Sequence, residues 1–132
     1  MDFDFFVDSR QSTVDYSPFI IRKMNNTIKI SASEALQKLK ESDKEFVSLF
    51  KHGMLDVEVY RPDKTDKQQP HDKDEVYIII SGEGNFYCEG RSFSFKSGDF
   101  LFVPAHAEHR FISFTEDLLT WVIFYGADGG EK

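Results

Sequence analysis

Short runs of β-branched and aromatic residues, separated by turn signals, constrain the fold of this chain more than any other feature. They extend from Phe46 to Tyr125, and glycine marks most of the turns between them. Branched and aromatic side chains favour strands because they pack well on a pleated surface. The spacing therefore predicts an all-β fold, an antiparallel sandwich or barrel. The expected strands span residues 46–50, 54–60, 76–80, 86–88, 92–95, 100–103, 109–114 and 120–125.

One short helix is expected before the strands. Ser31 and Glu34 have the spacing of a capping box, in which a serine hydroxyl and a glutamate satisfy the first free amides of a helix. Apolar residues follow at helical spacing, namely Ala35, Leu36 and Leu39. The pattern predicts an amphipathic helix over residues 31–43.

The chain of 132 residues is long enough for one domain with a core and too short for two. We expect an N-terminal arm over 1–30, a barrel over 46–125 and a loose, glycine-rich tail over 126–132. The arm should pack either on its own barrel or on a partner subunit, because it is too apolar for a disordered tail. The polar loop over 63–67 is expected to be solvated surface.

Charge and composition exclude several function classes. The net charge of -7 argues against nucleic acid as a partner, because a backbone binder needs a basic face. No segment reaches the roughly 20 apolar residues of a membrane span, and the acidic start does not resemble a signal peptide. Cys88 is the single cysteine, which excludes an internal disulfide and fits a reducing cytosol. We therefore expect a cytoplasmic protein.

His71, Glu75 and His109 are the candidate metal ligands. Imidazole and carboxylate are ligands shared by Zn²⁺, Fe²⁺, Mn²⁺ and Ni²⁺, and three protein ligands leave positions open for water or substrate. Four residues of an ideal strand span roughly 13 Å, too far for two ligands of one ion. The segment 72–74 must therefore bulge or curl if His71 and Glu75 are to meet.

The segment around these residues resembles the first motif of the cupin superfamily. That motif runs from His-x-His over three or four residues to a glutamate, and over six more to a glycine. Here His71 matches the second histidine, with Glu75 and Gly82 at the expected intervals.

The second cupin motif is matched independently by the segment that begins at Gly98. It requires a proline after five residues, which is Pro104, and a histidine three positions after a glycine position held here by His106. His109 occupies that histidine position, and Ser113 replaces the final asparagine. The resemblance implies a small single-domain cupin with an antiparallel β-barrel, a double-stranded β-helix or jelly roll, and a short N-terminal helix.

Two departures from the family pattern affect the site. Gln69 stands where cupins usually place their first histidine, and His106 where they usually place a glycine. The usual three histidines and a glutamate would shrink to His71, Glu75 and His109, with Gln69 as a fourth ligand or a hydrogen-bonding neighbour. His106 is interpreted as a pocket-rim or solvated residue. The alternative is that the spacing persists while the metal is lost.

The substrate pocket is predicted from side-chain parity. Tyr77 shares the parity of Glu75, so its hydroxyl should point into the barrel, where it orients a substrate, donates a proton or only fills space. Phe111 shares the parity of His109 and should line the same cavity. Phe102 and Trp121 are pocket walls or plain core. Cys88 is interpreted as a small structural residue.

The resemblance implies one divalent transition metal ion, Fe, Mn, Ni or Zn, in an enzyme of the oxygenase or isomerase type that acts on a small polar organic molecule. The alternative is a non-catalytic cupin module that binds a small molecule or a sugar. No residue is assigned a catalytic role beyond the open question of Tyr77. A homodimer is expected, with a small molecule as the other partner.

Overall fold

The computed structural model describes residues 27–132, so most of the predicted arm, residues 1–26, lies outside this range. One helix, α2, spans Ala32–Ser42. The strands in chain order are β2 Phe46–His52, β3 Leu55–Tyr60, β4 Asp74–Ser81, β5 Glu83–Cys88, β6 Arg91–Lys96, β7 Phe100–Val103, β8 His109–Phe114 and β9 Leu119–Tyr125. The short helix followed by strands agrees with the pattern of the sequence.

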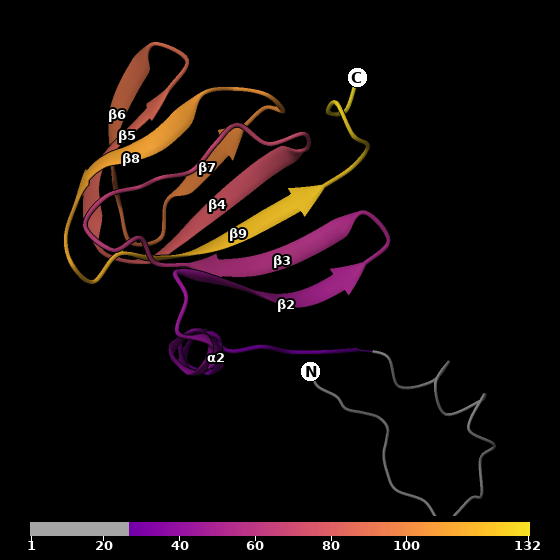
Figure 1. The fold of residues 1–132 in the computed structure, drawn as a ribbon, viewed down its shortest axis with the longest axis vertical. Coiled ribbons are helices and arrows are strands. Elements are labelled where there is room, and N and C mark those ends of the chain that lie inside the picture. The colour runs from indigo at the N-terminus through magenta and orange to yellow at the C-terminus, as the bar shows by residue number, and fades with distance from the viewer. Residues whose placement is uncertain (1–26) are drawn as a thin grey trace, which may run out of the picture.

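The strands form two antiparallel sheets (Figure 1). The larger sheet has the order β2-β3-β9-β4-β7, and the smaller one has the order β6-β5-β8. The predicted all-β fold is confirmed. The chain crosses from one sheet to the other between β4 and β5, between β6 and β7, between β7 and β8, and between β8 and β9. This alternation brings the start of β4 and the start of β8 to opposite walls of one interior.

The main core lies between the sheets and is dominated by aromatic rings. Tyr77 of β4 contacts Phe86 of β5 and Phe111 of β8 in edge-to-face arrangements, with ring centroids 5.7 Å and 5.1 Å apart. All three side chains are almost fully buried. Burial of such rings stabilises the fold by roughly 2 to 3 kcal/mol each before the loss of conformational entropy.

Helix α2 covers the outer face of the larger sheet beside β2 and β3 (Figure 1). The capping box predicted at its start is present, because the Ser31 hydroxyl accepts from Glu34 N and the Glu34 carboxylate accepts from Ser31 N. The buried stripe of the helix, Ala35 and Leu39, packs in a second cluster with Val59 and Leu119. The helix ends at Asp43, whose φ of 58° stops the helical path.

The tail after β9 is held in place, which differs from the loose tail predicted from its glycines. Gly129 N donates to the carbonyl of Asp72 (2.6 Å), and Glu131 N donates to the Asp74 carboxylate (2.8 Å). Lys73 Nζ lies 2.6 Å from the carboxylate of Asp128. The glycines serve these contacts, because positive φ at Gly129 turns the chain back toward β4.

Candidate metal centre

His71, Glu75 and His109 meet inside the molecule, although they come from three different elements. His71 lies in the bend before β4, Glu75 is the second residue of β4, and His109 is the first residue of β8. Glu75 and His109 are buried, and His71 is partly open to solvent. Each offers one ligand atom, and these atoms all lie within 4.8 Å of one another. The structure thus brings together the three residues that the sequence singled out.

The distances suit a shared divalent ion. Nε2 of His109 lies 3.2 Å from Oε1 of Glu75, and Nε2 of His71 lies 3.9 Å from the same oxygen. Two ligands about 2.1 Å from one ion lie roughly 3.0 to 3.4 Å apart in octahedral or tetrahedral geometry. The His109–Glu75 separation already falls in that range, and His71 requires only a small movement of its half-exposed ring.

The strongest sign of a missing partner is the unsatisfied hydrogen-bonding capacity of the buried atoms. Nδ1 of His109 lies 2.9 Å from the carbonyl oxygen of Ala107, so Nδ1 carries a proton and Nε2 is the ring nitrogen that points to Glu75. That nitrogen and both oxygens of Glu75 are buried, and none has a hydrogen-bond partner within residues 27–132. The buried carboxylate beside this nitrogen favours a cation between them, either a proton on Nε2 or a metal ion. A metal ion satisfies all three atoms at once.

The bend before β4 makes the geometry possible, as the sequence required. Residues 72 and 73 bend before the strand begins at Asp74. The carbonyl of His71 accepts from His106 N at 2.7 Å, and the Asp74 carboxylate accepts from Ala105 N at 2.9 Å. The Asp74 carboxylate accepts hydrogen bonds from the backbone amides of Glu131 and Ala105, and both lower its pKa, with the larger effect from Glu131. The turn after β7 and the tail after β9 therefore fix the bend from both sides.

His106 lies outside the centre and does not act as a ligand in this arrangement. Its φ of 68° explains why cupins usually place a glycine at this position. Nε2 of His106 lies 2.6 Å from the Asp72 carboxylate at the surface. It is exposed to solvent, which is one of the two roles that the sequence left open.

The pKa values of the two histidines move in opposite directions. Burial disfavours the charged form of His109, but the adjoining Glu75 carboxylate and the Ala107 carbonyl outweigh it and raise its pKa. Burial lowers the pKa of His71, and the Glu75 charge opposes this only in part. His71 is therefore neutral near pH 7, which is the form that binds a metal.

Gln68, not Gln69, is the amide that reaches the centre. Gln69 is exposed, so the structure does not bring this possible fourth ligand into the centre. The carbonyl oxygen of Gln68 accepts from the Tyr77 hydroxyl (3.0 Å) and lies 3.5 Å from Nε2 of His71. The prediction for Gln69 used the alternation of side chains along a strand, but residues 68–71 form a loop, where side chains do not alternate.

Asp66 orders this loop, although it lies in the segment that was predicted to be solvated surface. It is buried, and its carboxylate accepts from the Tyr60 hydroxyl (2.7 Å), from Phe111 N (2.8 Å) and from both nitrogens of Gln68 (3.0 Å each). These four bonds compensate the buried charge. No spacing or composition in a loop rich in aspartate and lysine distinguishes this carboxylate from its exposed neighbours.

Two of the predicted pocket residues lie elsewhere. Phe102 is 47% exposed on the outer face of β7, because its neighbours Leu101 and Val103 are the ones that face the core. Trp121 packs on the cluster beneath α2, on the opposite face of β9 from Val122. Neither residue lines the pocket. Trp121 therefore has the core role, one of the two that the sequence left open, whereas Phe102 points away from the core because neighbouring residues of a strand point to opposite faces.

Tyr77 and Phe111 lie on the interior side, as predicted, but they form the floor of the site. Both are buried completely or nearly so. Burial raises the pKa of the Tyr77 hydroxyl well above its ordinary value, and the Glu75 charge adds to this effect. Its proton is donated to Gln68, so the residue orients that amide.

A cavity of about 370 Å³ opens beside the exposed edge of His71. Its walls come from the larger sheet and the loop before β4, and they comprise Glu45, Phe46, Glu58, Tyr60, Lys67, Gln68, His71, Val122 and Phe124. A volume in this range suits a small organic ligand. Sequence reasoning missed most of these walls because no motif extends over β3.

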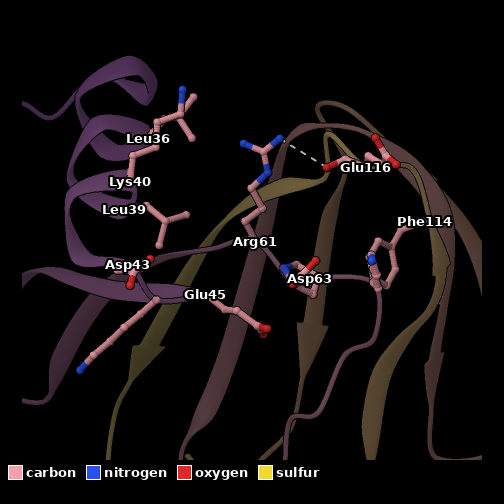
Figure 2. A pocket seen from close by; sticks show the side chains of 12 residues that line it. Leu36, Leu39, Lys40, Asp43, Glu45, Arg61, Asp63, Phe114 and Glu116 are labelled. Carbon is pink, nitrogen blue, oxygen red and sulfur yellow. Dashed lines mark hydrogen bonds between the residues drawn. The ribbon is translucent and has the colours of Figure 1, made fainter.

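A larger hollow of about 800 Å³ lies between α2 and the loops at the end of the barrel. Figure 2 shows Arg61 reaching across it, where Nη2 donates to the carbonyl of Glu116 at 3.4 Å. Neither histidine of the centre nor Glu75 lines this hollow. We place the functional site at the smaller cavity because it adjoins the unsatisfied ligand atoms.

The fold and the centre together define a small all-β protein with a candidate metal site of two histidines and one glutamate. The family model described as "Cupin domain" matches residues 56–125, more than half of the chain. The chain belongs to the cupin family.

Individual relatives agree with this assignment. An uncharacterized protein of Streptomyces coelicolor is 31% identical over 85 residues, which cover 63% of this chain and 81% of the relative. A solved structure of unknown function from Rhizobium leguminosarum has a TM-score of 0.61 at 19% identity, covering 76% of this chain and 98% of its own. A cupin superfamily protein from Desulfitobacterium hafniense has a TM-score of 0.50 at 17% identity, covering 60% and 73%. These structures support the fold alone. No helix among residues 27–132 is long and apolar enough to cross a membrane.

Proposed function

We propose that this protein binds one divalent transition metal ion through His71, Glu75 and His109 and acts as a metal-dependent enzyme, of the isomerase or oxygenase type, on a small polar organic molecule. The observation that carries the proposal is the group of three buried polar atoms on Glu75 and His109 that have no hydrogen-bond partner within residues 27–132. Hydrogen bonds leave few buried polar groups unsatisfied in native proteins, so such a group indicates a ligand.

The three side chains leave part of the ion's coordination sphere free. When bound, the metal supplies a Lewis acid and a position for an oxygen atom of the ligand. Of the three residues that would hold the ion, His71 also lines the 370 Å³ cavity, so a ligand in this cavity would lie beside the centre. Glu75 serves as a ligand, and the Nδ1 bond of His109 to Ala107 holds its ring in the ligating orientation.

The test is metal titration of the full chain by calorimetry with Zn²⁺, Mn²⁺, Ni²⁺ and, without oxygen, Fe²⁺. We expect one ion per chain for the parent protein and a loss of affinity of at least about 100-fold for His71→Ala and His109→Ala. His52→Ala is the matched control, because His52 is exposed at the end of β2. Stoichiometric binding that survives both histidine substitutions at the centre would contradict the proposal.

A second measurement separates an enzyme from a binding module. The metal-loaded protein is incubated with a panel of keto acids, enediols and sugar derivatives, and turnover and binding are followed by NMR. Metal-dependent turnover that is lost in His109→Ala supports the enzyme. Saturable binding without turnover across the panel supports the alternative from the sequence, a non-catalytic small-molecule or sugar-binding module.

We also propose a homodimer that forms through the outer face of the larger sheet. Phe100 and Phe102 of β7 are 62% and 47% exposed at the edge of that sheet, away from α2. Two exposed aromatic side chains on one edge strand offer apolar area that a second copy of the chain would bury. Sedimentation analysis of the parent and of Phe100→Ser/Phe102→Ser tests this, and a parent protein that is a monomer at all concentrations contradicts it. The free thiol of Cys88 is compatible with the cytoplasmic location proposed from the sequence.

A further inference from the structure

We propose that the cavity beside His71 takes a small organic ligand with a protonated amine, and that Glu58 is the counter-ion of this amine. The inference rests on the proposed function, because the oxygen end of the same ligand would face the metal. It adds the charge of the substrate and the residue that selects for it.

The position of Glu58 follows from the register of three strands. Glu58 of β3 pairs with Val122 of β9, which in turn pairs with Tyr77 of β4. These three residues form one row across the inner face of the sheet, and the neighbouring row ends at Glu75. Two inter-strand spacings of about 4.8 Å therefore separate the backbone of β3 from that of β4. Glu58 thus lines the same cavity as His71, on the inner face that also carries Glu75.

No ion pair within residues 27–132 compensates the charge of the Glu58 carboxylate. Its charged neighbours Asp56 and Glu75 carry the same sign. Lys51 is the cation that opposes them. Burial, then Asp56 and then Glu75 raise the pKa of Glu58 to about 7. A half-buried carboxylate in this state is stabilised by any cation that enters the cavity.

The remaining walls suit an ammonium group better than an anion. Glu45 and Glu58 place two carboxylates on the cavity, against one exposed cation, Lys67. Three aromatic side chains, Phe46, Tyr60 and Phe124, supply faces that attract a cation and apolar area for its carbon chain. The hydroxyl of Tyr60 is already bound to Asp66, so it does not compete for the ligand. An anionic group at this end would meet Glu58 without a fixed positive partner.

The test compares three probes with the same carbon chain: 3-aminopropan-1-ol, propane-1,3-diol and 3-hydroxypropanoate. Their binding to the zinc-loaded full chain is measured by NMR titration at pH 8, where Glu58 is mostly ionised. We expect the amine to bind at least about 10-fold more tightly than the diol, and the hydroxy acid to bind most weakly. A diol or hydroxy acid that binds as tightly as the amine overturns the inference, as does the absence of binding by all three.

Variants assign the selectivity to Glu58. Glu58→Gln should remove the preference for the amine, and Glu58→Asp, which keeps the charge, should retain part of it. Glu83→Gln is the matched control, because it removes one negative charge from an exposed position outside the cavity. A preference that persists in Glu58→Gln overturns the assignment.

Zinc titration of the same samples separates this inference from the proposed function. If zinc binds stoichiometrically while the amine preference is absent, the inference fails and the metal centre stands. If zinc does not bind while the amine preference depends on Glu58, the proposed function fails and the role of Glu58 stands.

Discussion

Replacing Glu58 by glutamine should stabilise the folded protein at alkaline pH and leave its stability almost unchanged at acid pH. The wild-type carboxylate has a folded-state pKa of about 7 against an ordinary value of 4.5. Because the folded state holds this proton more tightly, it binds more protons than the unfolded state between these two values. The free energy of unfolding therefore falls as pH rises through that window. Above pH 7 the full penalty of the ionised group is present, and below pH 4.5 it is absent.

The magnitude follows from the size of the shift. A rise from 4.5 to about 7 corresponds to about 3 kcal/mol before solvent screening is considered. The side chain remains partly open to the cavity, so screening reduces this to roughly 1 to 2 kcal/mol. For a domain of this size that is a rise in Tm of about 4 to 8 °C at pH 8.

The assay is urea unfolding of the parent and of Glu58→Gln at pH 5 and pH 8, with Glu83→Gln as the charge control. The difference between the two pH values cancels effects of the substitution that do not depend on ionisation. We expect a gain at pH 8 that exceeds the gain at pH 5 by roughly 1 to 2 kcal/mol. An equal gain at both pH values, or a loss at pH 8, would refute the claim that an uncompensated carboxylate faces the cavity.

The remaining predictions concern the fold and the network behind the centre. Gly84→Ala should destabilise the protein by more than about 2 kcal/mol in urea unfolding, because an added Cβ would overlap the Ser113 carbonyl between β5 and β8. The control Gly53→Ala should lose only about 1 kcal/mol, because Gly53 has open space around it and the cost comes from its positive φ alone. Equal losses in the two variants would contradict the close approach of β5 and β8. Ser31→Ala removes the helix cap and should lower the free energy of unfolding by about 1 kcal/mol, whereas an unchanged value in thermal unfolding would show that the cap contributes nothing. Asp66→Asn should weaken zinc binding in calorimetry by about 10-fold or more, because Asp66 positions Gln68, which in turn contacts His71. A zinc affinity equal to that of the parent would show that the hydrogen bonds of Asp66 do not support the centre.

The sequence predicts the fold and the meeting of His71, Glu75 and His109 because both depend on the spacing of residues along the chain. Alternating apolar runs and glycine turns place the strands, and the two spaced motifs place Glu75 and His109 at the starts of strands that the fold brings together. The bend at residues 72–73 follows from the reach of a strand. These inferences need no knowledge of loops.

The parts that the sequence does not predict depend on loops and on the choice of face. Gln68 and Asp66 act through a loop in which no periodicity relates position to direction. For Phe102, a shift of one residue decides whether the side chain faces the core or solvent, and the pairing of Glu75 with Val103 settles it. The role of Glu58 depends on its register with β9, which local sequence does not encode.

A crystal structure of the zinc-loaded full chain, with anomalous diffraction data at the zinc edge, tests the central claim most directly. The account predicts one strong anomalous peak about 2.1 Å from Nε2 of His71, Nε2 of His109 and a carboxylate oxygen of Glu75. A peak that contacts other side chains, or no peak between these three at saturating zinc, would contradict it.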